Sequence, residues 1–93
     1  MIQSLKHKGL KRLYHHDDAS GIRPDLLPRV RDVLARLDIV DDVQELAHVP
    51  GYRLHSLKGD LKGFWSITVR ANWRIIFRFE NGSAYDVELI DYH

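Results

Sequence analysis

The sequence predicts an α+β fold in which amino-terminal helices pack on one face of a mostly antiparallel sheet. In the first half of the chain apolar residues recur at helical spacing, whereas from residue 52 onward they alternate with polar residues, as in strands. The later segments are separated by short connections, which favour a meander of antiparallel strands. With 93 residues and 44% hydrophobic content, the chain is expected to form a single domain, residues 1–93.

The first half of the chain predicts two helices. Residues 2–6 could form a short strand, and whether they are an ordered edge strand or a mobile tail stays open. Residues 7–16 then space Leu10, Leu13 and Tyr14 at three and four positions, which is typical of a helix with one buried stripe. Residues 27–37 predict a longer helix, with Asp25 as its N-cap and Pro28 in its first turn. A short helical turn is expected around residues 42–47.

The second half predicts four strands, at residues 52–59, 64–71, 73–80 and 83–93. Asn81-Gly82 is the strongest hairpin signal, because both residues tolerate the positive φ of a type I′ turn.

Alternation assigns the faces of this sheet. One side is expected to meet the helices and to carry Trp65, Ile67, Val69, Trp73, Ile75, Phe77 and Phe79. The other side is expected to carry Ser66, Thr68, Arg70, Arg74, Ile76 and Arg78. A basic, hydroxylated face suits a phosphate backbone, although any antiparallel sheet shows a polar face to water.

The cysteine content, the length of the apolar runs and the distribution of charge restrict the classes of protein to which this chain could belong. The chain has no cysteine, which excludes disulfides, thiolate zinc sites and cysteine nucleophiles and indicates the cytoplasm. No signal peptide and no run of ~20 apolar residues is present, so a soluble protein without a membrane partner is expected. The net charge of +1 conceals segregation, since residues 1–16 are basic and residues 38–45 are acidic.

Most of the six histidines are discounted. His15 and His16 are adjacent, whereas a helical metal site places its histidines four residues apart. No metal ligand set, cofactor fingerprint or phosphate loop is present, so neither a metal nor a cofactor is expected.

Two motifs remain that could carry chemistry, His55 in the segment YRLHSLKGDLKG and the terminal Asp91-Tyr92-His93. Metal-independent RNA cleavage needs a base, an acid and cations around the phosphate. Histidine suits either proton transfer because it titrates near neutral pH. Lys58 and Arg74 could supply the positive charge, provided that the first, third and fourth strands are neighbours.

Long stretches of the sequence resemble the HigB and GraT branch of the RelE/ParE toxins of bacterial type II toxin–antitoxin modules. The likeness is carried by IQSLKHKGLKRLY, SGIRPDLLPRVRDVLARLD, PGYRLHSLKGDLKGFWSITVRANWRIIFRF and the closing DVELIDYH.

This resemblance implies a RelE-like, microbial-ribonuclease-like fold and a ribosome-dependent mRNA endoribonuclease that cleaves mRNA in the ribosomal A site and inhibits growth. It assigns catalysis to His55, Asp91, Tyr92 and His93, and phosphate binding to Lys58 and Arg74. We expect His93 to be the general acid and His55 the base; the reverse allocation, and a stacking role for Tyr92, stay open.

The resemblance also implies partners. These are a cognate HigA-like helix-turn-helix antitoxin, the ribosome with its 16S rRNA, mRNA, and operator DNA only through the toxin–antitoxin complex. The acidic segment 38–45 is one candidate antitoxin contact, and a solvated helix end explains it equally well. The alternative functions are a ParE-like gyrase inhibitor and an RNA-binding module without cleavage.

Overall fold

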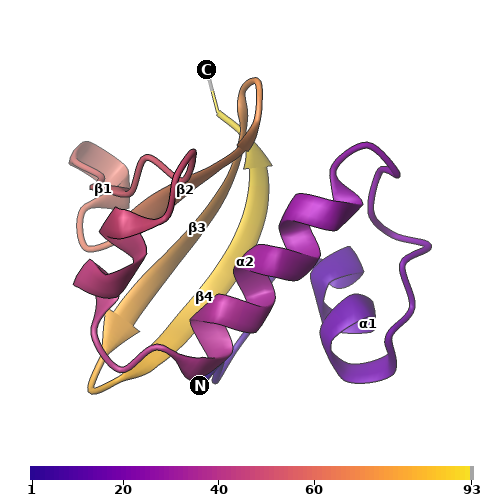
Figure 1. Ribbon diagram of the computed structural model, residues 1–93, viewed down its shortest axis with the longest axis horizontal. Coiled ribbons are helices and arrows are strands. Elements are labelled where there is room, and N and C mark those ends of the chain that lie inside the picture. Colours follow the sequence, from indigo (N-terminus) through magenta and orange to yellow (C-terminus); the bar gives the residue numbers. More distant parts are fainter. Residues whose placement is uncertain (93) are drawn as a thin grey trace.

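The computed structural model describes residues 1–92 and contains helices packed against a four-stranded sheet (Figure 1). The elements along the chain are α1 (Lys8–His16), α2 (Leu27–Ile39), the 3₁₀ helix η1 (Val43–His48), β1 (His55–Ser56), the 3₁₀ helix η2 (Gly59–Leu61), β2 (Trp65–Arg70), β3 (Trp73–Glu80) and β4 (Ser83–Asp91). The sheet has the order β1-β2-β3-β4, and each neighbouring pair is antiparallel. The α+β prediction is therefore confirmed.

The amino-terminal segment is ordered along the free edge of β4. Ile2 forms a parallel bridge with Ala84, and Leu5 forms one with Val87. The side chains of Ile2 and Leu5 are both buried. The backbone N–H of Ile2 also donates to the Asp38 carboxylate at 3.0 Å. The segment is thus an edge of the sheet and not a mobile tail, and β4 lies between it and β3.

Both predicted helices are present, but the predicted cap of the second is wrong. Leu26 occupies the N-cap position of α2 and makes no side-chain capping bond. Asp25 instead accepts two hydrogen bonds from Arg23, at 3.0 and 2.8 Å. The backbone is already helical at Leu26, so the aspartate lies one residue too early to cap the helix.

The first predicted strand is mostly absent. Within residues 52–59 only His55 and Ser56 form ladder pairs with β2, because the backbone turns at Arg53 (φ 49°) before them and at Gly59 (φ 67°) after them. Tyr52 adds a single hydrogen bond, in which its carbonyl oxygen accepts from the backbone N–H of Thr68 at 2.8 Å. The other three strands lie close to their predicted positions. Pro50-Gly51 follows η1, which Asp42 and Glu45 cap at its amino-terminal end.

The core lies between α2 and one face of the sheet. Val30, Val33 and Leu37 of α2 are fully buried, as are Ile75 and Phe77 of β3. This arrangement follows the predicted alternation, with one exception on β2.

Arg70 does not lie on the predicted side of the sheet. A register shift between Thr68 and Arg70 breaks the alternation, so that Arg70 pairs with Trp73, a helix-side residue. Its Nε lies 3.9 Å from the Asp25 carboxylate at the start of α2.

Candidate active site

The sheet face that points away from α2 carries His55 and Arg74, two of the six residues predicted to do chemistry, whereas Asp91 pairs with the helix-side residue Trp73. We call the face away from α2 the open face, defined by His55 and Ser66, Thr68 and Arg74, Ile76 and Glu88, and Ile90. Register shows that these residues share one side, because His55 pairs with Ser66, Ser66 with Ile76, and Ile76 with Glu88, while Arg74 pairs with Thr68 and Ile90. Ser66 is 1% exposed and Ile76 3% exposed, so the side chains at the middle of the open face are buried. The accessible side chains lie around them and are mostly polar.

His55 is the first residue of β1 and is exposed on this face. Its Nδ1 lies 3.1 Å from the carbonyl oxygen of Arg53, which reaches the ring because the chain turns sharply at that residue. A carbonyl can only accept, so Nδ1 carries the proton of the neutral ring. Nε2 is then the nitrogen with a free lone pair, which is the state that a general base requires.

Lys58 follows β1 by two residues and occupies the N-cap position of η2. It is exposed and forms no ion pair with any residue from 1 to 92. Its ammonium group is therefore available to an anionic ligand near His55.

Arg74 lies on β3, half-buried between Thr68 and Ile90. Its Nη1 donates to the carbonyl oxygens of Ala71, at 2.5 Å, and Trp73, at 3.1 Å. These bonds hold one end of the guanidinium group against the β2–β3 turn, so its positive charge has a fixed position on the open face.

The carboxyl-terminal residues are anchored beside the same turn. Asp91 ends β4 and pairs with Trp73, and the backbone N–H of Tyr92 donates to the carbonyl oxygen of Asn72 at 2.8 Å. The Tyr92 side chain is 40% exposed. His93, the fourth predicted catalytic residue, lies outside the described residues.

The condition that the first, third and fourth strands are neighbours is not met. β2 lies between β1 and β3, so His55 is two strands away from Arg74 and two residues further along the sheet. On a flat sheet this offset separates their Cα atoms by about 12 Å. Asp91 is three strands from His55, at the same end of the sheet as Arg74 (Figure 1). The candidate residues thus surround a surface that a ligand has to bridge.

Two titratable residues near this surface, Glu88 and His7, were not identified from the sequence. Glu88 occupies the same sheet row as His55, and its negative charge acts on His7, whose pKa it raises against the larger lowering effect of burial. His7 reaches this region because residues 2–5 run beside β4. Only that parallel pairing, which leaves no local sequence signal, could have linked the two residues.

The described part of the chain holds no group of three potential metal-ligating side chains. Nor does any helix within residues 1–92 have the length and apolar character needed to span a bilayer.

Comparison with known proteins decides the family. A sequence model described as "RelE-like toxin of type II toxin-antitoxin system HigB" matches residues 3–93. The chain belongs to this family of HigB-like toxins. The resemblance noted in the sequence is confirmed, and membership of a type II toxin family implies an antitoxin as partner.

Two curated relatives match the HigB-like chain over nearly its whole length. "Endoribonuclease HigB" of Proteus vulgaris is 50% identical over 93 residues and both chains are covered completely. "Toxin HigB-1" of Vibrio cholerae serotype O1 is 32% identical over 92 residues, which cover 96% of this chain and 95% of the relative.

Solved structures agree on the fold. YafQ from E. coli superposes with a TM-score of 0.61 at 14% identity, covering 95% of this chain and 87% of YafQ. The YoeB dimer from Staphylococcus aureus gives a TM-score of 0.59 at 15% identity, covering 99% and 94%. The RelE-like architecture of this HigB-like toxin is thereby confirmed.

Proposed function

We propose that this HigB-like toxin is a metal-independent endoribonuclease that cleaves mRNA on the translating ribosome. Its full-length relative at 50% identity is named an endoribonuclease, which supports this activity. The observation that carries the proposal is the exposed His55 with Nδ1 beside a carbonyl, on the sheet face that also holds Arg74.

The reaction is an attack of a ribose 2′-oxygen on the neighbouring phosphorus. His55 Nε2 takes the 2′-hydroxyl proton as the new P–O bond forms, and the bond from phosphorus to the 5′-oxygen breaks. A general acid returns a proton to that oxygen, leaving a 2′,3′-cyclic phosphate and a 5′-hydroxyl. We assign this acid role to His93, and Asp91 assists it.

The cations stabilise the extra charge on phosphorus in the transition state. Arg74 is preorganised by its two carbonyl contacts, whereas Lys58 approaches from the β1 side. Tyr92 is assigned a stacking role on a nucleobase, which its exposed ring and its backbone bond to Asn72 support. The wide spacing of these groups suits a substrate held extended by the ribosome and its 16S rRNA, in the cytoplasm.

Induced expression tests this function. New 5′ ends on cellular mRNA are mapped with the wild-type chain and with His55→Ala, with and without an antibiotic that stops initiation of translation. Cleavage in the wild type alone, and only during translation, is the expected result. Failure to cut naked RNA is compatible with the proposal, whereas growth arrest without new mRNA ends, accompanied by loss of gyrase supercoiling activity, contradicts it.

A further inference from the structure

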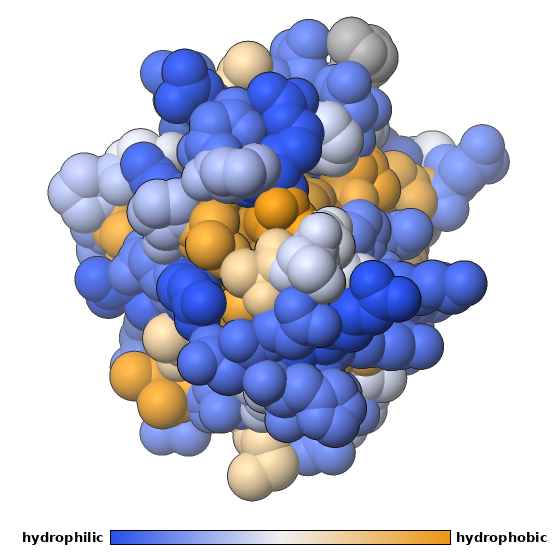
Figure 2. Space-filling view, turned by 90° about the vertical axis from the view of Figure 1, so that its right-hand side faces the viewer, coloured by the Kyte–Doolittle hydropathy of each residue, from blue (hydrophilic) through white to orange (hydrophobic). Residues whose placement is uncertain are grey.

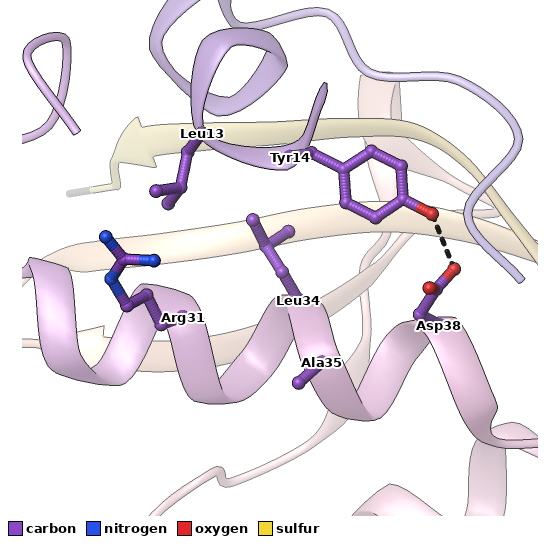
Figure 3. A pocket seen from close by; sticks show the side chains of 6 residues that line it. All are labelled: Leu13, Tyr14, Arg31, Leu34, Ala35 and Asp38. Carbon is purple, nitrogen blue, oxygen red and sulfur yellow. Dashed lines mark hydrogen bonds between the residues drawn. The ribbon is translucent and has the colours of Figure 1, made fainter. Parts of the chain in front are cut away.

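A groove on the side of the molecule away from the open face lies between the two long helices. Leu13 and Tyr14 of α1 form one wall, and Arg31, Leu34, Ala35 and Asp38 of α2 form the other (Figure 3). Its volume is about 170 Å³. Figure 2, which views the molecule from the side where α1 lies, shows an apolar strip within an otherwise polar surface.

The α2 wall is formed by residues three and four positions apart. Leu34 and Asp38 point toward α1, whereas Ala35 points away from it, at the outer edge of the groove (Figure 3). Ala35 is exposed and is the smallest of the four, so its short side chain leaves this edge of the groove open. Ile39, the next residue toward the end of α2, is 77% exposed, which extends the apolar surface beyond the groove.

The charges that remain available at the groove are positive. Asp38 already accepts hydrogen bonds from the Tyr14 hydroxyl, at 2.6 Å, and from the backbone of Ile2. Among residues 1–92 the ion-pair partner of Arg31 is Asp17, whose side chain is 80% exposed, so water screens this pair and a ligand can replace it. The exposed residues of α1 are Lys8, Lys11, Arg12, His15 and His16, and α1 has no acid.

We propose that this groove binds an acidic amphipathic helix of the antitoxin. The inference rests on the proposed toxin function, because it assigns the surface for that system's own partner. An apolar side chain of the helix enters the groove at the open edge beside Ala35, and a carboxylate beside it replaces Asp17 at Arg31. Helix-in-groove recognition uses this combination of apolar anchors at helical spacing with charged flanks.

RNA is the other polyanion that basic α1 could attract, but the groove floor favours protein. Leu13, Leu34 and Ala35 offer no donors to a phosphate or a base edge. A second copy of the chain is a third possible occupant, since residues 38–45 are acidic.

The test measures affinity for the helix-turn-helix antitoxin encoded beside the toxin gene, by titration calorimetry. Ala35→Trp obstructs the open edge of the groove and Arg31→Glu reverses the charge; each is expected to weaken binding at least about 30-fold, as loss of a central anchor does. Ala47→Trp, at an exposed alanine of η1, and Arg31→Lys are the matched controls, and each should stay within about threefold of the wild type. Circular dichroism confirms that each variant is folded.

Growth arrest by each variant without antitoxin separates this inference from the proposed function. We expect Ala35→Trp to arrest growth as the wild type does and to escape neutralisation by the antitoxin. Unchanged antitoxin affinity of the folded Ala35→Trp and Arg31→Glu variants overturns the groove assignment. So does a lower molecular mass of either free variant in light scattering, which indicates a second copy, or a loss of ribosome binding with antitoxin affinity intact, which indicates RNA. A wild-type chain that does not arrest growth overturns the proposed function instead, while the affinity comparison still reports on the groove.

Discussion

Asp91 pairs with Trp73 at the last rung of the β3–β4 ladder, and this pairing fixes the end of the sheet beside the β2–β3 turn. Tyr92 contributes one backbone hydrogen bond to Asn72 and an exposed ring. A single hydrogen bond is worth about 1 kcal/mol, so we expect a chain without residues 92–93 to remain folded. Growth arrest should be lost completely. Urea denaturation and a plate assay check both halves, and a truncated chain that still arrests growth would exclude these residues from catalysis.

Replacement of His55 tests the proposed base. We expect His55→Ala to reduce the rate of mRNA cleavage in a translating extract by about 100-fold or more, as loss of general acid–base catalysis does. His48→Ala, at an exposed histidine of η1, is the control and should cleave at the wild-type rate. Equal activity of all three proteins would assign the proton transfer elsewhere.

His7 makes stability depend on pH. Its pKa in the folded chain is lowered from 6.5, chiefly because burial penalises the imidazolium form, with Glu88 opposing. Its Nδ1 also accepts from the backbone N–H of Leu10 at 3.2 Å, a bond that only the unprotonated nitrogen can make.

Between the folded pKa and 6.5 the unfolded chain binds more protons than the folded one. The stabilisation is therefore full above pH 6.5 and is lost as the pH falls through the folded pKa. His7→Asn keeps a capping side chain but cannot titrate, so its stability should fall less than that of the wild type between pH 8 and about pH 5. Urea titrations at several pH values check this, and parallel curves for the two proteins would contradict it.

Gly9 tests the contact between α1 and the following loop. A Cβ atom at Gly9 would lie 2.4 Å from the carbonyl oxygen of Gly21, which is backbone and cannot swing away. Alanine usually stabilises a helix by up to about 1 kcal/mol relative to glycine. Here we expect Gly9→Ala to destabilise the fold by about 1–3 kcal/mol, as overpacking does. Thermal unfolding measures the effect, and Lys8→Ala at the exposed neighbour should change little.

Tyr52 tests a buried polar contact behind the sheet. Its ring is fully buried and its hydroxyl donates to the Asp32 carboxylate at 2.5 Å, which together raise the tyrosine pKa. Tyr52→Phe should cost about 1.5–3 kcal/mol, the usual range for a hydrogen bond to a charged group. Tyr92→Phe, at an exposed ring, should leave the denaturation midpoint unchanged, and equal midpoints for both variants would count against this contact.

Local patterns predicted much of the fold. The spacing of Leu10 and Leu13 marked α1, and alternation with Asn81-Gly82 marked β3 and β4. Features that depend on distant backbone could not be read. The strand predicted at 52–59 failed because Arg53 adopts a positive φ, and Arg70 was misplaced because a bulge shifts the register of β2.

For the candidate site, too, local patterns could be predicted from the sequence and long-range arrangement could not. Parity correctly placed Arg74 on the side away from the helices, because that assignment needs only local alternation. The predicted antiparallel meander is confirmed, and in this order β2 separates β1 from β3, so the condition that the first, third and fourth strands are neighbours is not met. The roles of all six candidate residues stay predictions.

The pairing of the amino-terminal segment with β4 has a consequence for how the chain matures. Ser4 and Asp86 are hydrogen-bonded although 82 positions separate them, so the outer edge of the sheet closes only after almost the whole polypeptide has been synthesised. Contacts of such long sequence separation form late and slow the folding rate. A nascent chain lacking β4 has neither this edge nor the rung that holds Asp91, so the proposed site assembles only after β4 has been synthesised.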